Sequence, residues 1–151
     1  MSADNIQTLA GTTIEVLESY AFLLGGPSDA KKGPPPFADP SWLVILAFSG
    51  SRAGGVGMVV SPAMARQVAA NLAGTEPTQV SDEQARDAAK ELLNIVCGKY
   101  LHQVGPREAL FDFAAPACFV VAREKAVQYA GGKPQATLEV EDHPLLVFIE
   151  N

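Results

Sequence analysis

Two uninterrupted apolar runs constrain the fold of this chain more than any other feature of its sequence. Residues 42–48 read WLVILAF and residues 145–149 read LLVFI. A strand with one exposed face alternates apolar and polar residues, so continuous runs of this kind are typical of strands covered on both faces. We therefore expect a sheet whose central strands lie beneath other parts of the chain.

Further strands are predicted over residues 55–60, 109–114, 117–122, 135–141 and 144–150. The short turn at 49–54 joins the strand at 41–48 to the next one as a hairpin, and the last two strands form a second hairpin around residues 142–143. Residues 137–141 (TLEVE) alternate between polar and apolar, which predicts a strand with one solvent-exposed face. Residues 123–133 are interpreted as a connection.

Three helices are predicted, each with its own start or stop signal. The first is capped by Asp4 or Asn5 and runs to about residue 24, where a glycine pair stops it. The second runs from Ser61-Pro62 to Gly74, and the third from about 82 to 101 or 102 behind a Ser81-x-x-Gln84 capping box. The fold class is α+β, with helices packed on one face of a largely antiparallel sheet.

The length of 151 residues is that of one domain with one core, so we expect residues 1–151 to form a single domain. Residues 25–40 (GGPSDAKKGPPPFADP) combine glycines with three consecutive prolines. Such a segment is not expected to form a helix or to pair in a sheet. We interpret it as an exposed connector inside the domain.

Charge and apolar content exclude several classes of partner. The net charge is −6 and the eleven Lys and Arg are scattered, which disfavours binding to nucleic acid. No apolar stretch approaches the roughly 20 residues that span a bilayer, and the N-terminus lacks the pattern of a signal peptide. We expect a cytoplasmic protein without membrane insertion, whose Cys97 and Cys118 are reduced core thiols.

A polar stripe lies along the third helix. Asp87, Glu91, Asn94 and Gly98 are spaced i, i+4, i+7 and i+11, which confines them to an arc of roughly 60°. Gly98 disfavours the helix, and Asp87 places a like charge one turn from Glu91. Spacing alone leaves two interpretations open, a functional surface and an ordinary solvated face.

The longer string Asp87-x-x-x-Glu91-x-x-Asn94, followed by Pro116 after twenty-one residues, resembles the signature of the CheC, CheX and FliY phosphatases. Its local forms here are DAAKELLNIVCGKY and FAAPACFVVA. CheC-like members carry two such helices. The other helices of this chain offer only Glu15-x-x-Glu18 and Val68-x-x-Asn71, so the nearer resemblance is to CheX, with a single signature helix.

The resemblance implies a phosphatase for a phosphorylated CheY-like response regulator in chemotaxis or another two-component pathway. It implies that Glu91 and Asn94 are catalytic, and that Asp87, Gly98 and Pro116 contact the partner. Asn94 would hold the attacking water and Glu91 would pair with the regulator's lysine. The Mg²⁺ is expected in the regulator, so no cofactor is expected on this chain.

Other hypotheses remain beside this one. The same helix could serve a non-catalytic module that binds a regulator or a switch component. A homodimer is a further hypothesis, with the apolar strand Leu145–Ile149 as its surface. No metal site is predicted, because His102 and His143 lack partners at ligand spacing.

Overall fold

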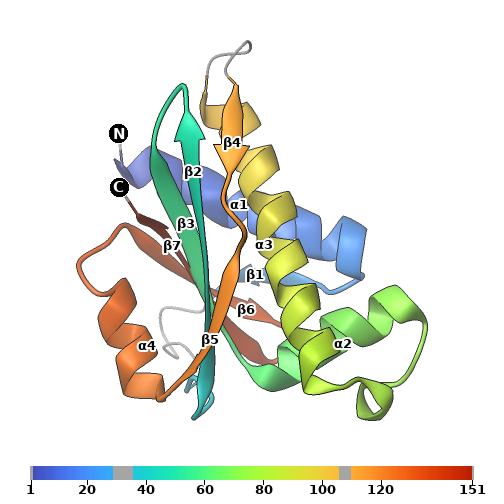
Figure 1. The fold of residues 1–151 in the computed structure, drawn as a ribbon. Helices are drawn as coiled ribbons and strands as arrows, with labels where there is room; N and C mark the ends of the chain where they lie inside the picture. The colour runs from blue at the N-terminus through green and yellow to red at the C-terminus, as the bar shows by residue number, and fades with distance from the viewer. Residues whose placement is uncertain (1, 29–35, 106–109, 151) are drawn as a thin grey trace.

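A single antiparallel sheet forms the centre of the computed structural model, which describes residues 2–28, 36–105 and 110–150 (Figure 1). The strand order is β1-β6-β7-β3-β2, and both β4 and β5 pair with the outer side of β2. The strands are β1 (Gly25–Pro27), β2 (Ser41–Gly50), β3 (Gly54–Val60), β4 (Phe111–Phe113), β5 (Ala117–Val121), β6 (Gln135–Val140) and β7 (His143–Glu150). Both predicted hairpins, β2–β3 and β6–β7, are confirmed.

The helices are α1 (Ser2–Ala21), α2 (Pro62–Ala73), α3 (Asp82–Val104) and α4 (Arg123–Ala130), with a 3₁₀ turn η1 at Pro77–Gln79. As predicted, α1, α2 and α3 share one face of the sheet, but α4 covers the other face (Figure 1). The prediction that residues 123–133 are a connection is therefore wrong, because residues 123–130 of this segment form α4. The buried side of α4 consists of two alanines, Ala126 and Ala130, so its apolar periodicity is too weak to recognise.

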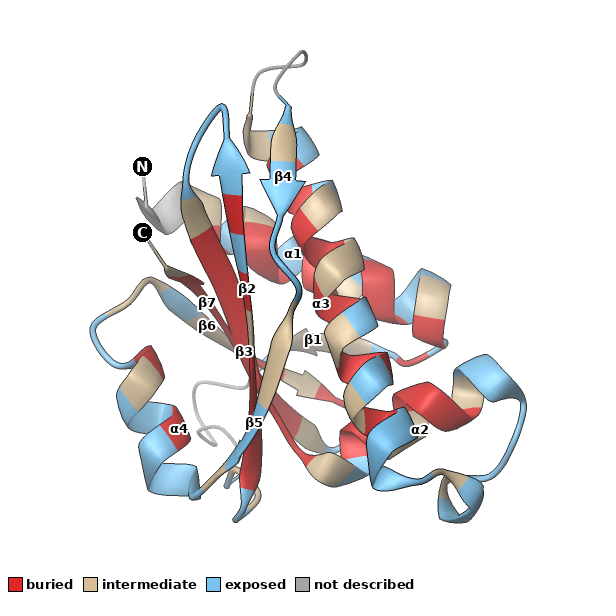
Figure 2. Ribbon diagram, viewed as in Figure 1, coloured by how far each residue is buried: buried red, intermediate tan, exposed pale blue. Residues whose placement is uncertain are grey.

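The central strands are buried on both faces, as the two apolar runs predicted (Figure 2). Along β7, Leu145, Val147 and Ile149 pack under α1–α3, whereas Leu146 and Phe148 pack under α4. Because β7 is hydrogen-bonded to β6 on one side and to β3 on the other, it has no free edge. The hypothesis that two copies pair through Leu145–Ile149 is therefore wrong.

The sheet has the same plan when followed from either edge. An edge strand (β1, or β4 with β5) comes first, then one hairpin, and the two hairpins meet at β7 and β3. The chain has two halves, α1 to α2 and α3 to β7, and in each half the edge strand follows a long helix, α1 or α3. The edge strand of each half pairs with the hairpin of the other half. The two halves therefore interlock, with α1 and α3 in corresponding positions.

The first helix and the segment after it differ from expectation. The helix begins at Ser2 and ends at Ala21, because Phe22 adopts a left-handed conformation with φ 58°. Residues 25–27 of the predicted connector form β1, which pairs with β6. Glycine tolerates extended backbone, and Pro27 at the end of an edge strand withholds no needed donor. Residues 29–35 of the connector, and residue 109 of the predicted strand at 109–114, lie outside the described residues.

Within the described ranges, none of the helices has both the length and the apolar content to cross a bilayer.

Candidate functional site

The site is built on α3, whose start is set by its own sequence. The Ser81 Oγ accepts a hydrogen bond from the Gln84 backbone N–H at 3.1 Å, and the Gln84 Oε1 accepts one from the Ser81 N–H at 2.9 Å. This confirms the predicted capping box. The acidic Asp82 and Glu83 in the first turn favour the helix N-terminus further. The inner side of α3 packs into the main core through nine buried residues: Ala85, Ala88, Ala89, Leu92, Leu93, Val96, Cys97, Tyr100 and Leu101.

The predicted polar stripe lies on the outward side of α3. Asp87 and Glu91 are exposed, and Asn94 and Gly98 are half-buried. Asp87 forms an i, i+3 ion pair with Lys90 at 3.4 Å. Among the residues that the structure describes, none forms a hydrogen bond or ion pair with the side chain of Glu91 or Asn94. Both polar groups are therefore available to another molecule.

The edge strands β4 and β5 run alongside α3 (Figure 1), and the link between them contains Pro116. In the pairing with β2, Phe113 lies opposite Phe48 and Ala117 lies opposite Ile45. The three residues 114–116 thus face the two residues 46–47 of β2, which makes a β-bulge with one extra residue. A proline is tolerated there because a bulge at a sheet edge needs no donor from it.

The bulge lies level with the middle of the stripe. Phe113, just before it, approaches Gly98, and Cys118, just after it, lies near Arg86 and Lys90. Asn94 is one helical turn from both Gly98 and Lys90, so the strand edge passes Asn94 at residues 114–116. Asn94 and Pro116, which the sequence separates by twenty-one residues, therefore lie at about the same height along α3.

Two cations line the side of α3 that faces β5. Burial raises the pKa of the Cys118 thiol, while the positive charges of Arg86 and Lys90 oppose that rise. The acidic groups of Asp87 and Glu91 are on the outer side of these cations. The stripe thus presents carboxylates outward, with positive charge between them and the sheet edge.

Gly98 is not required by the packing of the protein itself. A Cβ at this position would meet Phe113 Cε2 at 3.9 Å, an ordinary van der Waals contact. Alanine is the better helix former by about 0.8–1.0 kcal/mol. Glycine at this position therefore does not stabilise the fold, but it leaves this part of the helix surface without a projecting side chain. Phe113 borders the stripe and was not recognised from the sequence, because only the β2 pairing brings it next to α3.

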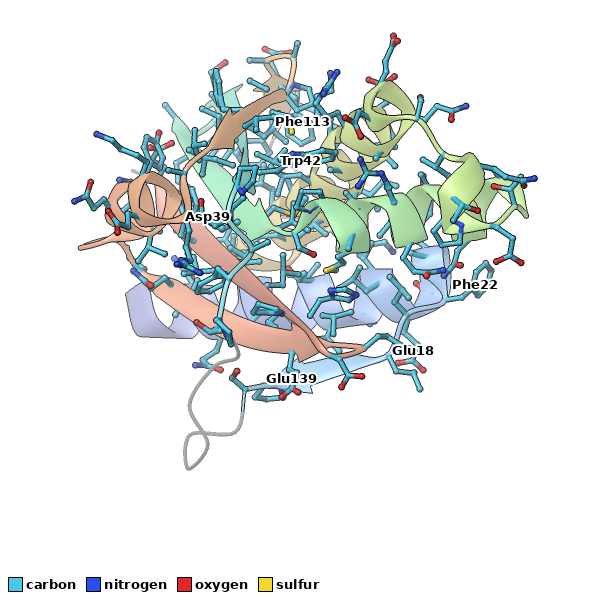
Figure 3. All side chains as sticks on the ribbon, turned by 90° about the horizontal axis from the view of Figure 1, so that it is seen from below. Glu18, Phe22, Asp39, Trp42, Phe113 and Glu139 are labelled. Carbon is cyan, nitrogen blue, oxygen red and sulfur yellow. The ribbon has the colours of Figure 1, made fainter. Side chains whose placement is uncertain are left out.

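The corresponding positions of the other helices do not form a second site of this type. Glu15 and Glu18 are exposed on α1, and Glu18 lies far from Phe113 (Figure 3). Val68 of α2 is buried, and the Asn71 amide donates to the Ala21 carbonyl at 2.8 Å.

Neither histidine lies within the stripe: His143 is next to Ser61, and His102 is in the last turn of α3. His143 Nδ1 is 3.4 Å from the Ser61 Oγ, and His102 is exposed on the last turns of α3. Across residues 2–28, 36–105 and 110–150, no three His, Cys, Asp or Glu side chains are grouped as a metal site would need.

Comparisons with known proteins show the family and the fold. The model of the family described as "Chemotaxis phosphatase CheX" matches residues 42–141. None of the curated protein sequences matches the chain.

Solved structures with the same fold cover nearly the whole chain. The chemotaxis protein CheX from Vibrio vulnificus matches with a TM-score of 0.70 at 16% identity, over 99% of this chain and 97% of that one. A chain in the complex of CheX with CheY, BeF₃ and Mg²⁺ from Borrelia burgdorferi matches with a TM-score of 0.66 at 19% identity, over 97% of this chain and 97% of that one. FliY from Thermotoga maritima matches with a TM-score of 0.59 at 12% identity, over 98% and 86%.

Proposed function

Since this chain belongs to the CheX family of chemotaxis phosphatases, we propose that it dephosphorylates a CheY-like response regulator through Glu91 and Asn94. One observation carries the proposal. A carboxylate and a carboxamide stand one turn apart on the outer side of α3, without partners among the described residues, and level with the bulge at Pro116. A solvated face needs no such pair, whereas an acyl-phosphate hydrolase acting in trans does.

The reaction requires a water molecule in line with the phosphorus atom. The water oxygen attacks, the bond between phosphorus and the regulator's aspartyl oxygen breaks, and the aspartate leaves as a carboxylate with release of inorganic phosphate. The amide of Asn94 can both donate and accept hydrogen bonds, so it can orient that water. The Mg²⁺ that neutralises the phosphoryl oxygens belongs to the regulator.

The other residues of the stripe act in docking. Glu91 pairs with the regulator's active-site lysine and anchors the helix there. Asp87 contacts the regulator one turn earlier, and Gly98 and Pro116 let its surface approach α3 closely. That the CheX of Borrelia burgdorferi forms a complex with CheY, BeF₃ and Mg²⁺ supports a CheY-like partner for this chain. With a CheY-like substrate, we expect the protein to act in the cytoplasm.

The proposal is tested by the lifetime of the acyl phosphate on receiver domains from the host genome. We expect the protein to shorten the lifetime for a cognate receiver, and Asn94→Ala to reduce the acceleration by about 10²-fold. Gln103→Ala, at an exposed position on the same helix, is the matched control and should keep full activity. An Asn94→Ala protein as active as its parent would show that Asn94 is not the catalyst.

A second measurement separates docking from chemistry. Glu91→Gln keeps the shape of the side chain and removes its charge, so it should raise KM and weaken the salt dependence of binding. If the parent protein binds phosphorylated receiver and leaves the phosphate lifetime unchanged, the chain is a binding module and the proposed catalysis is wrong.

A homodimer remains a proposal, with a different surface from the one first expected. The outer edge of β5 is unpaired in the described chain, and Phe119 and Val120 on it are 48% and 54% exposed. Open apolar edges of this kind favour pairing with a second strand. Light scattering should show a dimer that Val120→Lys dissociates, and a monomeric parent would contradict the pairing.

A further inference from the structure

A groove between α2 and α3 opens next to the polar stripe and has no role in the reaction described above. We infer that it receives an apolar side chain of the response regulator and so contributes to the choice of regulator. The inference rests on the proposed function, because it takes the regulator as the partner that covers α3.

The groove has a volume of about 400 Å³, which is ample for one large side chain. Two of the residues that line it, Ala69 on α2 and Ala88 on α3, have side chains no larger than a methyl group and so leave space between the helices. Leu72 forms one wall and is 41% exposed, so its side chain is accessible to a partner protein. Gln84 and Asp87 form the polar rim on the side of α3.

The groove is continuous with the stripe. Asp87 borders the groove and is also the first member of the stripe, one turn before Glu91. Its carboxylate pairs with Lys90, which lies on the β5 side of the helix, away from the groove. The mouth of the groove therefore stays open, and a protein that covers Glu91 and Asn94 also covers this mouth.

The chemistry of the lining selects the occupant. The lining consists of aliphatic side chains, one hydroxyl (Thr75) and two neutral amides, and Asp87 is the one charged residue that lines the groove in the described chain. With no cation present, the lining does not suit a phosphate or another anion. A buried apolar anchor surrounded by a polar rim is the common arrangement at protein interfaces. An apolar residue of the regulator, next to its phosphorylation site, fits this description.

The test fills the groove without touching the stripe. Ala73 lines the groove and is exposed at the end of α2, so Ala73→Gln should fold normally and occupy the hollow. Ala63→Gln, exposed near the start of the same helix, is the matched control. Leu72→Ala removes the wall instead of filling the space. The probe is the cognate receiver domain activated with beryllofluoride and Mg²⁺.

We expect Ala73→Gln and Leu72→Ala each to raise the dissociation constant about tenfold, to raise KM equally, and to leave kcat unchanged. Ala63→Gln should bind as the parent does. If both groove variants bind as tightly as the parent while Asn94→Ala loses turnover, the groove has no role and the proposed function stands. If the parent binds the receiver without turnover and the groove variants bind more weakly, the groove inference stands and the proposed catalysis fails.

Discussion

The ring of Phe148 lies against the backbone of Gly57, its cross-strand neighbour in the β3–β7 pair. A Cβ at Gly57 would lie 2.1 Å from the ring's Cζ atom, far inside van der Waals contact. The same ring meets Tyr129 of α4 edge-on, with the centroids 5.8 Å apart. The glycine is what lets an aromatic side chain lie flat on the sheet and support the helix on that face.

Gly57→Ala should therefore destabilise the protein. The ring cannot move away without losing its contacts with α4, so we expect the free energy of unfolding to fall by about 1–3 kcal/mol. Urea denaturation followed by circular dichroism measures the change. Gly26→Ala is the control, because nothing lies within 4 Å of a Cβ built there. Equal stability of the two variants would contradict the packing described for Phe148.

Gly98→Ala should separate stability from function. The free energy of unfolding should rise by up to about 1 kcal/mol, since the position is helical and has room for a methyl group. Affinity for the regulator should fall, because the methyl group projects from the docking stripe. Gly11→Ala on α1, where a Cβ would meet nothing within 4 Å, should stabilise the protein and leave the affinity unchanged. A Gly98→Ala protein that binds normally would remove Gly98 from the docking surface.

The two thiols should react at different rates. Burial raises the pKa of Cys97 to about 12, and this residue has no exposed surface. Burial also raises the pKa of Cys118, but that residue is only half-buried at the sheet edge. With a disulfide reagent at pH 8, Cys118 should react first and Cys97 only as the protein unfolds. Cys118→Ala should abolish the faster phase, and a fast phase that survives this change would place Cys97 at the surface.

Stability should decline at alkaline pH in a way that depends on Tyr129. Its hydroxyl donates a hydrogen bond to Glu150 Oε1, and this bond, with burial and the carboxylate charge, raises the pKa of Tyr129 to about 12. The unfolded pKa is about 10, so the stabilisation is complete below pH 10 and is lost as the pH rises through 12. Tyr129→Phe should lower stability at pH 8, and its difference from the parent should shrink towards pH 12. A difference that stays constant with pH would contradict the hydrogen bond to Glu150.

Local sequence patterns determined much of the fold and the main features of the site. The apolar runs marked β2 and β7 as central strands, because side chains facing both ways must all be buried. The cap at Ser81 set the start of α3, and the 3.6-residue period then placed Glu91 and Asn94 on its outward side. Each of these features depends on residues close together in the chain.

The tertiary structure alone decided which distant segments meet. The bulge at Pro116 reaches the level of Asn94 only because β4 and β5 both pair with β2. The groove beside Asp87 is lined by residues from α2, from α3 and from the segment between these helices, so it forms only when the two helices pack together. Helix α4 and strand β1 likewise have weak local signals and are stabilised by the surfaces they cover or extend. Helix capping, and which side of a helix or strand is buried, depend on residues that are close together in the chain. Strand pairing and helix packing depend on contacts between residues far apart in sequence, so a local sequence pattern does not specify strand pairing or helix packing.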